Sequence, residues 1–134
     1  MVGCSGGKDN AQTNGPSFSA RYMYVANSLN NSIGIYALDM SNGLLANLGN
    51  VATGINPYSL AMDPKGMYLY SANFGSNSVS AFSINATNGS LTNIGTYPTE
   101  KNPASVAVDP GGKFVYVANS VSNTISIYLI NPGT

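Results

Sequence analysis

The chain contains no histidine, no tryptophan and a single cysteine. Without histidine, a His-based general base, a Ser-His-Asp triad or an ordinary zinc site cannot be assembled from this sequence. Only 7% of the residues are charged and five basic residues balance five acidic ones, so no basic surface is available for nucleic-acid phosphates. No apolar run approaches the roughly 20 residues that span a bilayer. We therefore expect no metal ion, no cofactor and no nucleic-acid partner.

The residues that are abundant favour β-structure. Hydrophobic residues make up 43% of the chain and include nine tyrosines, enough to build a packed core. Most of the polar residues are Asn, Ser, Thr and Gly, a mixture typical of short strands joined by tight turns. Gly, Pro and Asn-Gly pairs interrupt every long window, so no segment keeps a helical period.

A repeat runs through the chain. The segment Tyr24–Asn27 (YVAN) recurs as residues 70–73 (YSAN) and residues 116–119 (YVAN), an interval of 46 residues both times, from 24 to 70 and from 70 to 116. Further pairs share the spacing: Gly43 with Gly89, Gly49 with Gly95, Pro57 with Pro103, and Asp63-Pro64 with Asp109-Pro110. A constant interval without insertions is typical of stacked structural repeats, and this length suits the blades of a propeller.

Each unit predicts four short strands separated by turns. The expected strands are residues 58–63 and 104–109 (first), 22–26, 68–72 and 114–118 (second), 33–38, 79–84 and 125–130 (third), and 45–52 and 91–97 (fourth). Several are apolar on both faces, which indicates a sheet packed between similar sheets. The expected fold is all-β: β-propeller blades of four antiparallel strands. A β-sandwich of irregular short strands is the alternative, but it does not explain the constant interval.

The repeat divides the chain into four parts: residues 1–17, a lipobox-like start with a flexible linker; residues 18–53, a partial blade without its first strand; residues 54–98, a complete blade; and residues 99–134, a partial blade that stops after its third strand. About two and a half blades make an incomplete ring, because closed propellers have about 4–8. We expect the open ends to be covered by further C-terminal blades or by self-association.

The layout of these motifs resembles a known family. Tyr-Val-Ala-Asn is followed by Asn-Ser-Ile-Gly-Ile-Tyr, Asn-Gly-Leu-Leu, Asn-Pro and Asp-Pro-Lys-Gly, and this order resembles the start of lactonase-type seven-bladed propellers, the 6-phosphogluconolactonase-like proteins that overlap with the YVTN repeat group. The resemblance covers Arg21 to Pro132. It implies a carbohydrate or sugar-lactone ligand at the channel mouth. It assigns no catalytic residue here, since the family's reactive groups lie largely in blades beyond this segment.

The lone cysteine stands near the N-terminus. Met1-Val2-Gly3-Cys4-Ser5 resembles the end of a bacterial lipobox, and a Gly-, Ser- and Asn-rich stretch follows it. We therefore predict lipidation at Cys4, membrane contact only through that anchor, and a place in the bacterial cell envelope as a periplasmic or surface lipoprotein. A stray thiol on a cytoplasmic protein is the alternative.

Residues that recur in every unit are best explained by structure. Asp63 and Asp109 precede Pro and should cap turns. The repeated asparagines should bond to nearby backbone groups, and the repeated tyrosines should pack between blades, in the sets Asn27, Asn73 and Asn119; Asn31, Asn77 and Asn123; Tyr24, Tyr70 and Tyr116.

Residues that depart from the repeat are better candidates for a ligand site, because packing does not require them. Tyr58 stands where the next unit has Ala104, and Phe74 stands where the other units have serine. Glu100 and Lys101 form a charged pair in the loop that enters an innermost strand. Loops and channel mouths commonly hold ligands, so these four residues are the predicted site.

Two functions remain open from the sequence. The first is hydrolysis of a sugar lactone by a lactonase-like propeller, in which this segment itself lacks recognisable catalytic residues and is expected to be inactive. The second is a non-catalytic binding or scaffold propeller anchored at the cell surface. His, Glu and Arg on later innermost strands would favour the enzyme, whereas further featureless repeats would favour the scaffold.

Overall fold

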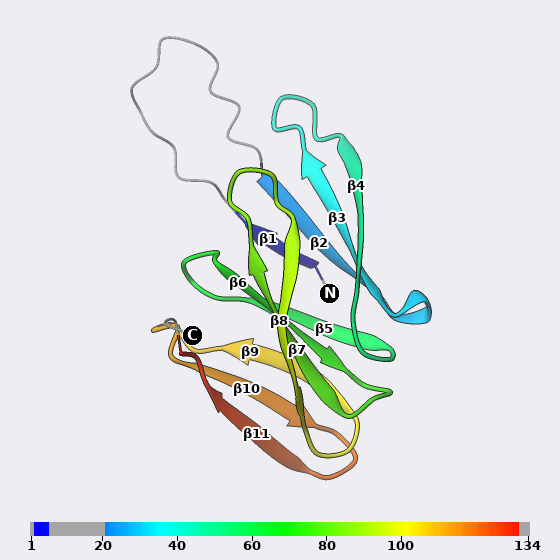
Figure 1. Cartoon of the computed structure of the whole chain (residues 1–134), viewed down its shortest axis with the longest axis vertical. Helices are drawn as coiled ribbons and strands as arrows, with labels where there is room; N and C mark the ends of the chain where they lie inside the picture. The colour runs from blue at the N-terminus through cyan, green and yellow to red at the C-terminus, as the bar shows by residue number, and fades with distance from the viewer. Residues whose placement is uncertain (1, 6–20, 132–134) are drawn as a thin grey trace.

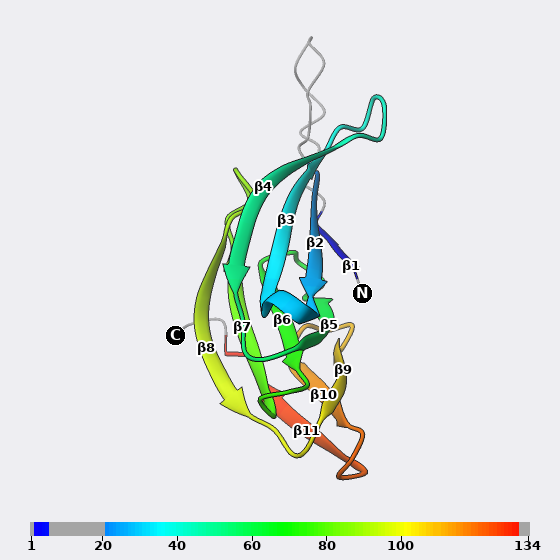
Figure 2. The same ribbon diagram turned by 90° about the vertical axis from the view of Figure 1, so that its right-hand side faces the viewer.

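A computed structural model describes residues 2–5 and 21–131, which form three antiparallel sheets and one short 3-10 turn, η1 (Ser28–Asn30). The sheets are stacked one after another along the long axis of the molecule (Figure 1), and the same order is seen from the side (Figure 2). The first sheet contains β1 (Val2–Ser5), β2 (Arg21–Asn27), β3 (Ser32–Leu38) and β4 (Leu45–Ala52); the second contains β5 (Pro57–Met62), β6 (Tyr68–Asn73), β7 (Ser78–Ile84) and β8 (Leu91–Pro98); the third contains β9 (Pro103–Val108), β10 (Phe114–Asn119) and β11 (Thr124–Leu129).

The strands are paired in chain order within each sheet, and the pairing repeats from sheet to sheet. The β3–β4 ladder is interrupted between Ile35 and Tyr36, and the β7–β8 ladder is interrupted between Ala81 and Phe82, 46 residues later (35 to 81). This agreement confirms the predicted all-β architecture of propeller blades, and the part of the chain that the structure describes does not close into a ring.

The turns between the first and second strands are organised by aspartate, as predicted. The Asp63 Oδ1 atom accepts hydrogen bonds from the backbone nitrogens of Met67 (2.6 Å) and Tyr68 (2.7 Å). Asp109 Oδ1 accepts the equivalent bonds from Lys113 (2.6 Å) and Phe114 (2.7 Å). Chiefly because of the bond from Phe114, the pKa of Asp109 is lowered. These carboxylates therefore hold turns and explain why Asp recurs at this position.

The first interface, between the first and second sheets, is closed by large apolar side chains. Its core consists of Tyr22, Tyr24, Ile33 and Ile35 from the first sheet and Leu60, Leu69, Phe82 and Leu91 from the second. The turn between β7 and β8 also covers it, because the Tyr22 hydroxyl donates to the Thr87 carbonyl and the Tyr24 hydroxyl to the Gly89 carbonyl, both at 2.8 Å. Burial raises the pKa of Tyr24 to about 12.

The second interface, between the second and third sheets, is lined by smaller residues. Its core consists of Tyr70, Ala72, Val79 and Ala81 from the second sheet and Val106, Val115 and Val117 from the third. The opposite face of the third sheet exposes Phe114, Tyr116, Ile125, Ile127 and Leu129. As predicted, Tyr24 and Tyr70 pack between sheets, whereas Tyr116 lies on this exposed face with 37% of its surface accessible.

The first sheet differs from the sequence prediction. We expected it to lack its opening strand, but Val2–Ser5 form β1 and pair antiparallel with β2, with Cys4 opposite Met23. An uncovered β2 edge would leave backbone N–H and C=O groups without partners, and any nearby extended segment can satisfy them. β1 is shorter than β5, the strand that opens the second sheet, because β1 has four residues and β5 has six. The rest of the predicted linker, residues 6–17, lies outside the described residues.

Candidate ligand-binding face

A set of loops lies along one edge of the stack and is called the loop face. Each of these loops follows either the second or the fourth strand of a sheet, and together they comprise residues 28–31, 53–56, 74–77, 99–102 and 120–123. Asn31 Oδ1 accepts a hydrogen bond from the Asn56 backbone nitrogen, and Asn77 Oδ1 accepts one from Asn102, both at 2.8 Å. All four asparagines have positive φ angles between 50° and 57°, a region that Asn tolerates better than most residues. The repeated Asn31 and Asn77 therefore lock each loop to the loop of the next sheet, as predicted.

Two of the predicted site residues meet on this face. Tyr58 projects from β5 and Phe74 follows β6, and their ring centroids are 5.2 Å apart with planes inclined at 32°. The Phe74 backbone nitrogen donates to the Asn56 carbonyl at 2.9 Å, which fixes the start of its loop. Tyr58 is 56% exposed. The pair is therefore a preformed aromatic surface that solvent reaches.

The two charged candidates lie in the next loop. Its backbone is held in the same way as the preceding loop, because the Lys101 nitrogen donates to Ser122 Oγ at 2.8 Å as the Ile55 nitrogen donates to Ser76 Oγ at 3.0 Å. Glu100 occupies the position that Gly54 has one unit earlier. The earlier loop has no room for a side chain at this position.

That lack of room is visible around Gly54, where a Cβ atom would lie 2.5 Å from Ser76 Oγ. Glu100 and Lys101 are both exposed. Hydrogen bonds link the loop of the charged pair to the loop of Phe74. Asn102 Nδ2 donates to the Phe74 carbonyl at 3.4 Å, and the Thr99 nitrogen donates to the Asn77 carbonyl at 2.9 Å, beside the bond from the Asn102 nitrogen to Asn77 Oδ1.

The electrostatic influence of Glu100 reaches Tyr128. Burial is the main cause that raises the pKa of Tyr128, and the negative charge of Glu100 adds to it. The Tyr128 hydroxyl donates to the Pro98 carbonyl, two residues before Glu100. Tyr58 and Phe74 are thus brought together directly, whereas Glu100 and Lys101 are connected to that pair only through the hydrogen bonds between their two loops.

The other described carboxylates are occupied. Asp39 Oδ1 accepts hydrogen bonds from the Ser41 hydroxyl (2.6 Å) and the Ser41 backbone nitrogen (2.8 Å), which lower the pKa of Asp39. Asp63 and Asp109 hold the turns described above. Across the described ranges there is no group of three or more His, Cys, Asp or Glu side chains placed to hold a metal ion. Glu100 is therefore the described carboxylate that remains available to a ligand.

A buried polar network in the second sheet did not follow from the sequence. Asn73 is fully buried, and its Nδ2 atom donates to Ser78 Oγ (3.1 Å) and Ser80 Oγ (2.9 Å) while its Oδ1 accepts from Ser71 (3.0 Å). We expected side-chain-to-backbone bonds at this position, and the bonds instead join side chains. The signal was the alternation of Ser78 and Ser80 on β7, together with Ser71, which pairs with Ser80 from β6.

The third sheet has the same asparagine without the matching serine. Val117 replaces Ser71, so Asn119 Oδ1 has no hydrogen-bond partner in the described structure although Asn119 is only 2% exposed. Asn119 Nδ2 still donates to Thr124 and Ser126. The substitution leaves one buried acceptor unsatisfied.

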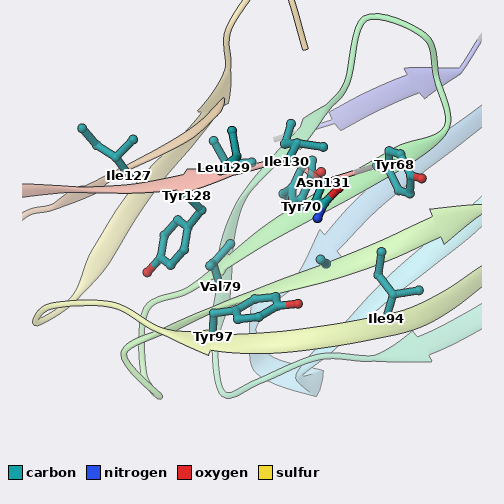
Figure 3. Close-up of a pocket in the computed structure, with 12 residues that line it drawn as sticks. Tyr68, Tyr70, Val79, Ile94, Tyr97, Ile127, Tyr128, Leu129, Ile130 and Asn131 are labelled. Atoms are coloured by element: carbon teal, nitrogen blue, oxygen red, sulfur yellow. The ribbon is translucent and has the colours of Figure 1, made fainter. Parts of the chain in front are cut away.

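A cavity of about 620 Å³ opens at the outer end of the second interface. Figure 3 shows Tyr68 and Tyr70 on β6, Tyr97 on β8 and Tyr128 on β11 around this cavity, whereas Ile127 and Leu129 project to the other side of β11. Burial is the main cause that raises the pKa of Tyr70 to about 12. The sequence did not predict this cavity, and none of the four candidate ligand-binding residues lines it.

The chain matches the family model described as "Lactonase, 7-bladed beta-propeller" over residues 16–106 and again over residues 63–134. The two matches overlap, as expected for a repeated structure. No match is found among curated proteins. No helix among the described residues is both long and apolar enough to cross a membrane.

Solved structures support the same family. A Bacteroides fragilis protein assigned as a 6-phosphogluconolactonase is 26% identical, with a TM-score of 0.78 over 84% of this chain and 33% of that one. A Lactobacillus plantarum protein is 25% identical, with a TM-score of 0.77 over 90% of this chain and 40% of that one. The Pseudomonas aeruginosa periplasmic gluconolactonase PpgL, 23% identical with a TM-score of 0.77, shares the fold over 84% of this chain.

This chain spans about a third of the length of the first and last of these structures, whose matched shares are both 33%. The repeated four-stranded sheets, the family match along most of the sequence and these structural neighbours agree. The chain belongs to the lactonase family of seven-bladed β-propellers.

Proposed function

We propose that this chain is the segment of a lactonase-type propeller that binds a sugar lactone on its loop face, and that the whole protein hydrolyses the lactone. The observation that carries the proposal is the Tyr58–Phe74 pair, whose ring centroids lie 5.2 Å apart, with Tyr58 exposed on β5 and Phe74 half-buried in the loop between β6 and β7. Aromatic side chains with a few polar neighbours are the usual lining of small-molecule sites. The pair offers an apolar surface to the C–H face of a sugar ring.

Glu100 and Lys101 provide the polar part of the proposed site. A lysine ammonium can donate to ring or exocyclic oxygens of the ligand and can pair with a phosphate where one is present. A carboxylate accepts hydrogen bonds from sugar hydroxyls. The backbone of their loop is tied to the Phe74 loop through Asn102, and the proposed ligand extends from the aromatic pair toward these two residues.

The chain on its own is proposed to bind without catalysing. Lactone hydrolysis needs a base for the attacking water and donors for the developing oxyanion. Asp39, Asp63 and Asp109 accept hydrogen bonds from their own turns, and the chain has no histidine. In the proposed whole protein, the reacting groups are supplied by other blades.

Binding of gluconolactone tests this proposal directly. Tyrosine fluorescence reports on the site, because the chain has no tryptophan to mask it. We expect saturable quenching that Tyr58→Ala and Phe74→Ala each weaken about tenfold or more, a loss of about 1.4 kcal/mol. Tyr116→Ala is the matched control, since it removes an exposed tyrosine from the far face of the third sheet. Equal loss in the control, or no saturable binding, would reject the site.

A non-catalytic binding or scaffold propeller is the second candidate. It is favoured by the regularity of the loop face, where the same asparagine bond joins successive sheets and makes a rigid platform. A hydrolysis assay on a longer chain distinguishes the two candidates. If that chain binds the lactone but the lactone is hydrolysed no faster than in buffer alone, the protein is a scaffold. Robust turnover by residues 1–134 alone would contradict the proposed division between binding here and catalysis elsewhere.

We also propose lipidation at Cys4 and a location in the cell envelope, in keeping with the periplasmic neighbour PpgL. Backbone pairing of Cys4 in β1 with Met23 in β2 competes with this, because a lipid-bearing N-terminal residue would have to leave the sheet. Palmitate labelling of the protein expressed from its natural gene tests the anchor, and Cys4→Ser should abolish it. Labelling that persists in Cys4→Ser contradicts lipidation at this residue.

A further inference from the structure

Two turns of the molecule carry the same Asn-Gly pair. They are the β3–β4 turn (residues 39–44), with Asn42-Gly43, and the β7–β8 turn (residues 85–90), with Asn88-Gly89. The two glycines have φ angles of 75° and 73°, and each glycine nitrogen donates to the carbonyl four residues earlier at 2.8 Å. Each asparagine side-chain oxygen accepts a bond from the backbone nitrogen two residues later, at 2.9 Å in the first turn and 3.0 Å in the second. The pairs therefore share one local structure, and a difference in their reactivity has to come from their surroundings.

An Asn-Gly pair can modify itself without an enzyme. The glycine backbone nitrogen loses its proton to hydroxide and attacks the asparagine Cγ atom, so that a C–N bond forms and the side-chain nitrogen leaves as ammonia. Water then opens the resulting succinimide ring, and the product is either aspartate or isoaspartate. Glycine favours the attack because it has no Cβ atom to hinder the approach. The reaction requires that the glycine nitrogen leave its carbonyl partner and that water reach it, so the turn has to open locally.

The surroundings of the two turns differ. Gly43 is exposed, and a Cβ atom placed on it would meet nothing within 4 Å. Gly89 is buried, and a Cβ atom placed on it would overlap the Tyr22 ring. The Tyr22 hydroxyl donates to the Thr87 carbonyl at 2.8 Å. The Tyr24 hydroxyl donates to the Gly89 carbonyl, also at 2.8 Å. The β7–β8 turn is therefore held by the first sheet as well as by its own bonds, whereas the hydrogen bonds described for the β3–β4 turn lie within that turn.

We propose that Asn42 is a site of spontaneous deamidation. Asn88 is protected from the same reaction by the Tyr22 and Tyr24 hydroxyls. Opening the β7–β8 turn breaks two hydrogen bonds that have no counterpart at the β3–β4 turn in the described part of the chain, and this lowers the population of the open form at least about tenfold. Because deamidation is slow compared with the opening and closing of a turn, its rate follows that population. The inference does not depend on the proposed sugar binding, because neither turn is part of the loop face.

Asp39 acts against this difference. It lies in the β3–β4 turn, and its carboxylate disfavours the negatively charged nitrogen that attacks Asn42. The β7–β8 turn has the uncharged Asn85 at the equivalent position, 46 residues later (39 to 85). Asp39 is exposed, so solvent and salt screen its charge. Asp39 therefore reduces the difference between the two rates but does not reverse it.

Mass spectrometry of the folded chain tests the proposal. The protein is incubated in a mildly alkaline buffer, samples are digested briefly with trypsin at successive times, and fragmentation of each peptide locates the converted asparagine. Cleavage after Arg21, Lys65 and Lys101 places the two pairs in separate peptides, residues 22–65 and 66–101. We expect Asn42 to react at least about tenfold faster than Asn88. Equal rates at the two asparagines, or a faster reaction at Asn88, would overturn the proposal.

The same assay in urea separates the effect of the turn structure from that of the local sequence. Once the chain is unfolded, the tyrosines no longer hold the β7–β8 turn, and Asn42 and Asn88 should react at similar rates. A difference that persists unchanged in urea would assign the effect to the neighbouring residues and contradict protection by the tyrosines.

A double variant removes the two hydroxyls and keeps the aromatic rings. Tyr22→Phe combined with Tyr24→Phe should raise the rate at Asn88 about fivefold or more and leave the rate at Asn42 unchanged. Tyr116→Phe is the matched control, because Tyr116 lies on the exposed face of the third sheet, and it should change neither rate. An unchanged rate at Asn88 in the double variant contradicts the protective role of the hydroxyls.

A second measurement needs no variant, in case the double variant does not fold. Amide hydrogen exchange of Gly43 and Gly89 reports the local opening that the reaction requires. After correction for the rates in the unfolded chain, the Gly89 amide should exchange at least about tenfold more slowly than the Gly43 amide. Equal protection of the two amides would show that the tyrosines do not hold the β7–β8 turn closed, and the proposal would be wrong.

Discussion

The two interfaces between sheets use equivalent positions but end differently. The first is sealed at its outer end by the β7–β8 turn, which accepts hydrogen bonds from Tyr22 and Tyr24. The second ends in a cavity in front of Tyr68 and Tyr70. Because the tyrosines are conserved in the repeat, the difference arises from the strand and turn that cover them. In a stack of repeats each unit contacts its neighbours alone, so stability should be distributed unequally between the two interfaces.

The largest expected effect compares Phe82 with Tyr128, which stand 46 residues apart (82 to 128) at the same position in their sheets. Phe82 is fully buried in the first interface, whereas Tyr128 is half-buried beside the cavity. Phe82→Ala should lower the free energy of unfolding by about 3–5 kcal/mol. Tyr128→Ala should lower it by about 1 kcal/mol. Denaturant titrations give both values, and similar losses would show that the interfaces are equally closed.

Two glycines with the same backbone conformation provide the next test. Gly43 and Gly89 have φ angles of 75° and 73°, but a Cβ atom on Gly43 meets nothing within 4 Å while one on Gly89 collides with the Tyr22 ring. Alanine at either position should cost about 1 kcal/mol for the left-handed conformation. Gly89→Ala should cost about 1–3 kcal/mol more, because it pushes the turn away from the interface. Equal costs, measured by chemical denaturation, would contradict the sealing role of this turn.

The same comparison explains how much of the fold and of the candidate site could be predicted from the sequence. The 46-residue interval predicted the strands because Asp63, Asp109 and the loop asparagines repeat wherever the same local bond repeats. The interval also distinguished Tyr58 and Phe74 from the structural residues, because residues that depart from a repeat are not required by its packing. Their pairing was not predicted, because it depends on how β5 and the β6–β7 loop are oriented.

Other features depend on contacts that a local pattern does not encode. β1 forms because the edge of β2 accepts a nearby extended segment, and Val2–Ser5 have no counterpart in the repeat. The cavity depends on how β8 and β11 are placed on either side of the second interface. The unsatisfied Asn119 oxygen depends on one exchange, Ser71 in the second sheet for Val117 in the third. Each of these features depends on contacts between residues far apart in the sequence.

That exchange gives a prediction whose sign is unusual. Both Val117→Ser and Val117→Ala remove apolar contacts from the second interface, and a buried hydroxyl is ordinarily the more costly replacement. Here the serine hydroxyl can donate to Asn119 Oδ1, as Ser71 donates to Asn73. Val117→Ser should therefore be more stable than Val117→Ala by about 1 kcal/mol. Thermal unfolding of the two variants measures the difference, and the opposite order would show that the Asn119 oxygen gains nothing from a donor.

The smallest effect should be independent of whether an interface is closed. Asp39 in the first sheet's turn and Asp109 in the third sheet's turn both have lowered pKa values because neighbouring groups donate hydrogen bonds to them. A lowered folded-state pKa favours the charged form, so its contribution to stability is fully present above the unfolded pKa near 3.8 and is lost as the pH falls through the folded value. Asp39→Asn and Asp109→Asn should each reduce the fall in melting temperature between about pH 7 and about pH 3. Because Asp39 is exposed and Asp109 is only partly buried, the two reductions should be small and similar. A much larger reduction for Asp109→Asn would mean that acid opens the second interface first, and would tie the pH response to the cavity rather than to the turn.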